Sequence, residues 1–119
     1  MLCKYVHFEE GTSQNATLVG CFHQLGVESF PATPRFYIYT VLTNAVGNAT
    51  IKVLIESLET GAELFAQDNI PIKFNSKLGT VQVSIPVKEC TFSAGGWYQV
   101  TLLVDGDWVA QRRLRLYQT

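Results

Sequence analysis

Two cysteines and two histidines near the start of the sequence have the types and spacing best suited to chemistry. They are Cys3, His7, Cys21 and His23, and thiolates and imidazoles are ligands that zinc prefers. If their segments form a hairpin that closes around Ser13, Cys3 lies opposite His23 and all four side chains share one face. Along one strand, however, Cys3 and His7 are about 13 Å apart, at roughly 3.3 Å per residue. We therefore expect Cys3 and Cys21 to fill a core face, and a small-ligand or metal site in this hairpin stays open as the alternative.

The remaining residues do not indicate a catalytic apparatus. A group that transfers protons at neutral pH is most often histidine, and neither His7 nor His23 adjoins a glycine-flanked nucleophile motif. The sequence has no glycine-rich phosphate-binding loop. A calcium site needs several carboxylates from neighbouring loops, whereas Asp105 and Asp107 supply one loop and are typical turn residues. We expect no catalytic residue, no resident metal and no cofactor, and hence a protein that is not an enzyme.

Residues near the end of the sequence indicate recognition rather than catalysis. Trp97 and Gln99 share one face of an expected strand, and Arg113 and Arg115 share the same face of the next strand. Tryptophan and arginine are enriched at the energetic centres of protein interfaces. The alternative is a solvated face on which the stem of Arg115 covers Trp97 as a cation–π pair. We predict an interaction surface formed by Trp97, Gln99, Arg113 and Arg115.

The strands that must position these residues flank Asp105-Gly106-Asp107, which is a strong hairpin signal between two alternating runs. Both apolar sets reach one core only if the loop has an odd number of residues or a strand contains a bulge. The apolar members are Tyr98, Val100, Leu102 and Val104 in the first run and Ala110, Leu114 and Leu116 in the second.

We favour a three-residue loop, from Asp105 to Asp107, as the source of the odd count. Arg112 then falls on the core face near the sheet edge, where its stem packs and its head reaches water. The predicted pairs are Val104 with Trp108, Leu102 with Ala110, Gln99 with Arg113, and Trp97 with Arg115.

The rest of the sequence contains further strand-like runs and no helical periodicity. Pro31 and Pro34 lack ladder donors and mark a crossover, and Pro71 places its run at a sheet edge. Turn signals recur about every ten residues, which is typical of a sandwich or barrel. The runs before the final hairpin are residues 2–8, 16–24, 35–43, 49–58, 62–67, 70–74 and 80–87.

Length and composition limit the cellular context. The 119 residues suit one domain, 1–119, and ten acidic residues balance nine basic ones, so the broad positive field that favours nucleic acid is lacking. No apolar run approaches the roughly 18 residues of a membrane span, and the first residues lack a signal-peptide core. Cys3, Cys21 and Cys90 are typical of small buried thiols in a reducing compartment. We expect a cytoplasmic protein whose partner is a protein, another copy of the chain included, and neither nucleic acid nor a membrane.

Several segments carry a resemblance to known families. Gly96-Trp97-Tyr98 at the start of a strand resembles the tyrosine corner of immunoglobulin-like sandwiches, in which the tyrosine hydroxyl bonds to upstream backbone. The other segments are L-C-K-Y-V, L-V-G-C-F, F-P-A-T-P-R-F, E-T-G and G-W-Y-Q-V-T-L-L-V-D-G-D-W-V-A-Q-R. With them the whole chain resembles a bacterial family of short uncharacterised β-sandwich proteins, a domain of unknown function.

The resemblance implies an all-β fold of about eight strands, a two-sheet antiparallel β-sandwich with distant immunoglobulin-like architecture. It brings no activity with it. We therefore predict a non-catalytic protein-interaction or structural module.

Overall fold

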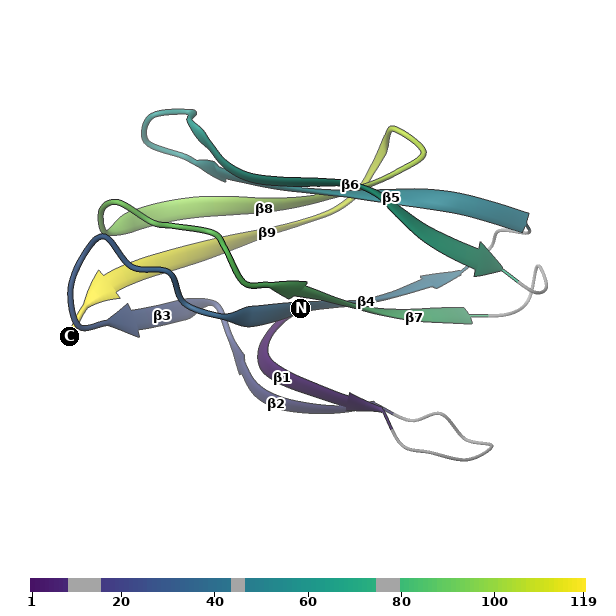
Figure 1. Ribbon diagram of the computed structural model, residues 1–119, viewed down its shortest axis with the longest axis horizontal. Helices are drawn as coiled ribbons and strands as arrows, with labels where there is room; N and C mark the ends of the chain where they lie inside the picture. The colour runs from purple at the N-terminus through teal and green to yellow at the C-terminus, as the bar shows by residue number, and fades with distance from the viewer. Residues whose placement is uncertain (9–15, 44–46, 75–79) are drawn as a thin grey trace.

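Nine β-strands make up the described part of the chain, residues 1–8, 16–43, 47–74 and 80–119 of a computed structural model (Figure 1). No helix within these ranges is long and apolar enough to cross a membrane. The all-β prediction is therefore confirmed. In chain order the strands are β1 (Leu2–Phe8), β2 (Ala16–Phe22), β3 (Gln24–Val27), β4 (Phe36–Thr43), β5 (Gly47–Ser57), β6 (Glu63–Phe74), β7 (Thr80–Val87), β8 (Gly96–Val104) and β9 (Asp107–Gln118).

The strands form two sheets. One has four strands in the order β2-β1-β4-β7, and the other has five strands in the order β3-β9-β8-β5-β6. Figure 1 shows that the five-stranded sheet is curled. Both sheets contribute apolar side chains to one hydrophobic core, as the alternating runs require. The core includes Phe36, Ile38, Ile85 and Val87 from the first sheet and Ile51, Val53, Ile55, Leu114 and Leu116 from the second.

The chain changes sheets at His23, which the sequence did not indicate. One strand was expected over residues 16–24, but β2 ends at Phe22 and β3 begins at Gln24 in the other sheet. The backbone N–H of Arg115 donates a 3.0 Å hydrogen bond to the His23 carbonyl oxygen, and β3 then runs parallel to β9. Because an edge strand has unpaired backbone groups, β3 satisfies the edge of β9 that β8 leaves free. The expectation of about eight antiparallel strands is thus corrected to nine described strands with one parallel pair.

The final hairpin forms with a shorter turn than expected. Asp105 and Gly106 have φ angles of 50° and 87°, as in a two-residue type I′ turn. Val104 pairs with Asp107, so the three-residue loop and the pairing of Val104 with Trp108 are wrong. The type I′ turn is preferred because its twist matches that of the flanking strands.

A bulge in the hairpin supplies the odd residue that parity requires. It lies between the pairs of Leu102 and Leu103, and Val109 is the additional residue on β9. The remaining predicted pairs are therefore confirmed. These are Leu102 with Ala110, Gln99 with Arg113, and Trp97 with Arg115.

The apolar face of β8 is also confirmed. Tyr98, Val100 and Leu102 are buried, whereas Arg113 on the opposite face is exposed. Gln99 is only partly exposed, because β5 and β9 lie on either side of it in the sheet.

Pro71 lies in an edge strand, as predicted, because β6 is the last strand of the five-stranded sheet. The two short runs expected over 62–67 and 70–74 are one strand. They are joined through Asn69, whose φ of 58° accompanies a register shift between β5 and β6.

Candidate interaction surface and neighbouring pocket

The outer face of the five-stranded sheet brings the predicted interaction residues together. Trp97 pairs directly with Arg115, and Gln99 pairs with Arg113. Directly paired residues share a face, with their Cβ atoms about 5 Å apart. The side chain of Trp97 is 43% exposed, both arginines are exposed and Gln99 is partly buried. These four residues therefore form one continuous surface.

The guanidinium of Arg115 lies over a different ring from the one expected. Its Cζ atom is 5.9 Å from the ring centroid of Tyr117, which lies two residues further along the same face of β9. Its Nη1 atom also lies 3.5 Å from Oε1 of Gln24 on β3. The cation–π contact of Arg115 is therefore with Tyr117, whereas the alternative named Trp97.

Leu58 and Tyr117 extend the surface, and sequence reasoning missed both. The backbone N–H of Leu58 donates a 3.0 Å hydrogen bond to the Trp97 carbonyl oxygen, which places Leu58 beside Trp97. Leu58 and Tyr117 are 43% and 40% exposed. We call the set the outer patch: Leu58, Trp97, Arg113, Arg115 and Tyr117.

Charge is distributed unevenly across this face. One cross-strand row contains Glu63, Glu56, Gln99 and Arg113, on β6, β5, β8 and β9 respectively. At about 4.8 Å per strand, Arg113 is about 10 Å from Glu56 and about 14 Å from Glu63. Among the described residues the only ion pair joins Lys52 to Asp68, so none of these three charges forms an ion pair with another described residue. Along this row the charge is therefore acidic on β5 and β6 and basic on β9.

The alternation of residues 49–58 already placed Glu56 on an outward face. What the sequence lacked was the neighbour of β5, because β5 pairs with β8 across more than forty residues of chain. Such long-range pairing has no local sequence signal.

The predicted tyrosine-corner hydrogen bond is present at the start of β8. The hydroxyl of Tyr98 donates a 2.5 Å hydrogen bond to the carbonyl oxygen of Ala94. The Tyr98 ring packs edge-on against Phe92, with ring centroids 4.8 Å apart. Burial raises the pKa of Tyr98. With Tyr98 anchored inward, the adjacent Trp97 is held on the outer face.

The first hairpin has a different register from the one considered. Cys3 pairs with Cys21 rather than with His23, because β2 ends before His23 and the chain leaves for the other sheet. Leu2 packs in the main hydrophobic cluster, so alternation puts the adjacent Cys3 and its partner Cys21 on the outer face of this sheet. The expectation that both cysteines are buried in a core face is therefore wrong: Cys3 is fully buried, but Cys21 is exposed.

The two sulfur atoms are 3.1 Å apart and share a hydrogen bond. Burial, and after it the hydrogen bond and charge of Cys21, raise the pKa of Cys3 to about 11. Burial alone raises the pKa of Cys90 to about 11.

The histidines do not complete a metal site in the part that the structure describes. His23 is exposed, and its Nε2 atom lies 3.2 Å from Nε2 of Gln24. The backbone of His7 pairs with Thr17, and its side chain lies outside the described residues. Among described residues, no group of three or more histidine, cysteine or acidic side chains is placed to hold a metal ion.

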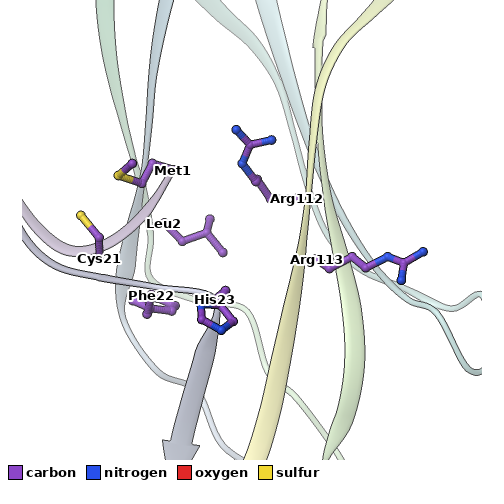
Figure 2. Close-up of a pocket in the computed structure, with 7 residues that line it drawn as sticks. All are labelled: Met1, Leu2, Cys21, Phe22, His23, Arg112 and Arg113. Carbon is purple, nitrogen blue, oxygen red and sulfur yellow. The ribbon is translucent and has the colours of Figure 1, made fainter.

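A pocket of 260 Å³ separates the end of β2 from β9 (Figure 2). Figure 2 shows the side chains of Arg112 and Arg113 leaving β9 in opposite directions, with Arg112 on the side of Met1. Arg112 pairs with Val100 on the core face yet is exposed, as predicted, although β9 is not an edge strand: the pairing of β3 with β9 begins only at Arg115. The pocket is lined by Met1, Leu2, Cys21, Phe22, His23, Arg112 and Arg113.

The carboxylate of Asp105 has a structural partner. Its Oδ1 atom accepts a 2.9 Å hydrogen bond from the backbone N–H of Thr50 and a 3.3 Å hydrogen bond from the Thr50 hydroxyl. This connects the tip of the β8–β9 hairpin to β5, which is the turn role expected for Asp105.

Comparison with known proteins identifies the family. Residues 1–117 match the model of a family of unknown function, DUF6941. The match covers nearly the whole chain, and the protein belongs to this family. Searches of curated proteins and of solved structures each returned no match.

Proposed function

We propose that the protein is a non-catalytic interaction module that associates with a second copy of itself through the outer face of the five-stranded sheet. The observation that carries this proposal is the row from Glu63 and Glu56 to Arg113, which has charges of opposite sign at its two ends and no ion pair from these charges to any described residue.

A two-fold axis parallel to the strands makes this face complementary to itself. Rotation about such an axis preserves position along the strands and reverses position across them. The β5–β6 side of each copy, with Glu56 and Glu63, then faces the β9 side of the other copy, with Arg113 and Arg115. Self-complementary interfaces of this isologous kind are the commonest in soluble oligomers.

Apolar side chains on the same face supply the second requirement of a stable interface. Trp97, Tyr117 and Leu58 are each at least 40% exposed; Trp97 and Tyr117 lie beside Arg115, and Leu58 lies beside Trp97. Aromatic and arginine side chains are frequent energetic centres of interfaces, and paired strands order them before binding. Nucleic acid is a poorer partner for this face, because Glu56 and Glu63 oppose phosphate there.

Charge reversal tests the proposal by complementation. One variant combines Arg113→Glu with Arg115→Glu, and the other combines Glu56→Arg with Glu63→Arg. We expect the parent protein to dimerise in sedimentation velocity, each variant alone to be monomeric, and an equimolar mixture of the two variants to form a heterodimer. Only the mixture restores opposite charges at both contacts.

Arg35→Glu with Lys88→Glu is the matched control for the arginine variant. It lowers the net charge by the same amount, at exposed positions outside the five-stranded sheet. This control should dimerise as the parent does. A parent that stays monomeric at all concentrations, or a mixture of variants that stays monomeric, would contradict the proposal.

We also propose that the two sheets form an immunoglobulin-like β-sandwich. The hydrogen bond from Tyr98 to Ala94 supports this, because it has the geometry of a tyrosine corner. An experimental structure with a different strand connectivity would reject it.

We further propose a bacterial protein of the cytoplasm, on the family resemblance and on its three free cysteines, Cys3, Cys21 and Cys90. Fractionation of the producing cells should return the protein with the cytoplasmic contents, and recovery from the periplasm or from the medium would count against this location.

A further inference from the structure

Cys3 and Cys21 are placed for reaction with each other. They are directly opposite on β1 and β2, and their sulfur atoms are 3.1 Å apart. A disulfide bond is about 2.0 Å long and joins Cα atoms about 4.4–6.8 Å apart, a range that includes directly paired antiparallel residues. Bond formation therefore needs about 1 Å of sulfur movement and no change in the strand register.

The two thiols differ in access to solvent. Cys21 is exposed and borders the 260 Å³ pocket, whereas Cys3 is fully buried behind it. A reagent in solution therefore meets Cys21 first. Cys90 provides a contrast within the same chain, because it is fully buried and has no neighbouring thiol among the described residues.

The pocket beside Cys21 also favours a negatively charged reagent. Arg112 lines it, and its guanidinium has no acidic partner within the described part of the chain. Carboxylates of a small reagent would find a cation there.

We propose that Cys3 and Cys21 form a redox-active dithiol, which a small anionic disulfide in the pocket beside Arg112 oxidises to an intramolecular disulfide. This assignment is independent of self-association, which uses the outer face of the other sheet.

The reaction proceeds by two exchanges. Cys21 releases its proton to water, and its sulfur attacks one sulfur of the reagent RSSR. The reagent S–S bond breaks, a mixed disulfide forms on Cys21, and the first thiolate leaves and is protonated. Cys3 then loses its proton to water, attacks the Cys21 sulfur and displaces the second thiolate. The protein loses two electrons and two protons, and the reagent leaves as two thiols.

Formation of the mixed disulfide on Cys21 also lowers the pKa of Cys3. The charge of Cys21 contributes to the high pKa of Cys3, and an alkylthio group on Cys21 carries no such charge. The second exchange therefore becomes easier once the first has occurred.

Mass spectrometry of the reduced full chain with oxidised glutathione tests the proposal. The parent should lose two hydrogens and retain no glutathione. Cys3→Ser should retain one glutathionyl group on Cys21, Cys21→Ser should remain unmodified, and Cys90→Ser should behave as the parent. Substitution of the buried Cys3 can disturb folding. Peptide mapping of the unreduced parent therefore locates the Cys3–Cys21 bond without any substitution.

A neutral reagent separates the role of Arg112 from that of the cysteines. Arg112→Gln should react severalfold more slowly with oxidised glutathione, and at the parent rate with bis(2-hydroxyethyl) disulfide. A parent that stays reduced, or that keeps glutathione on Cys21 without a bond to Cys3, would overturn the dithiol assignment. Equal slowing with both reagents would overturn the preference for an anion.

Discussion

The hydroxyl of Tyr98 donates a 2.5 Å hydrogen bond to the carbonyl oxygen of Ala94, four residues earlier in the chain. The bond ties the segment that precedes β8 to the first inward-facing residue of that strand. Since Trp97 is adjacent to Tyr98 and faces outward, the same anchor that closes this end of the core also positions the outer patch.

Replacing Tyr98 with Phe should therefore destabilise the protein. The buried ring is retained, but the Ala94 carbonyl loses its donor, so we expect the free energy of unfolding to fall by about 1–2 kcal/mol. Urea unfolding followed by circular dichroism measures this. Tyr117→Phe is the control, because Tyr117 is exposed, and it should change stability by less than about 0.5 kcal/mol. Equal effects of the two changes would show that the Tyr98 bond does not stabilise the fold.

The turn residue Asp105 should be sensitive for two reasons. Its φ of 50° disfavours most side chains, and its carboxylate accepts a hydrogen bond from the Thr50 backbone. Asp105→Ala should lower the free energy of unfolding by about 2 kcal/mol, and Asp105→Asn by less, because asparagine tolerates this backbone region and keeps an acceptor. Asp107→Ala is the matched control, with an expected change below about 0.5 kcal/mol. Thermal unfolding would distinguish them, and a larger loss at Asp107 would contradict this account.

The final hairpin shows how far sequence alone could go. Alternation required one additional residue between the apolar runs of the two strands. The register predicted from this requirement correctly paired Gln99 with Arg113 and Trp97 with Arg115. The prediction that a three-residue loop supplies this odd residue was wrong, because Asp105-Gly106 makes a two-residue turn and the odd residue lies in a bulge next to Leu102. Parity is a local property, but a bulge between apolar residues has no distinct composition.

The first hairpin shows where local reasoning fails. Residues 2–8 are apolar on both alternating sets, so the expectation that Cys3 rather than Leu2 faces the core rested on no clear alternation and was wrong. The change of sheets at His23 depends on the free edge of β9, which is contributed by the last strand of the chain. The charge row from Glu56 to Arg113 was missed for the same reason, since it exists only once β5 and β8 have paired.

Alkaline pH should weaken the fold through Cys90. Burial raises the pKa of its thiol from 9 to about 11. Below pH 9 the thiol is protonated in both states. Between pH 9 and 11 the unfolded chain loses this proton and the folded protein keeps it, so the free energy of unfolding falls as pH rises.

Urea unfolding at several pH values between 8 and 11 measures this slope. Cys90→Ala should reduce the slope, whereas Val87→Ala, which also removes side-chain volume from a fully buried site, should leave it unchanged. An identical slope in the parent and in Cys90→Ala would assign the alkaline sensitivity to other groups.

Self-association, if it uses the charged row, should weaken as salt is added. The proposed contacts join Arg113 and Arg115 of one copy, which are exposed, to Glu63 and the partly buried Glu56 of the other. The screening length falls from about 10 Å at 0.1 M salt to about 3 Å at 1 M. We expect the dissociation constant measured by sedimentation to rise severalfold over this range. Trp97→Ser should weaken association at every salt concentration without changing the salt slope, because it removes apolar contact and no charge. Association that is insensitive to salt, or that strengthens with it, would indicate that Trp97, Leu58 and Tyr117 act without the charges.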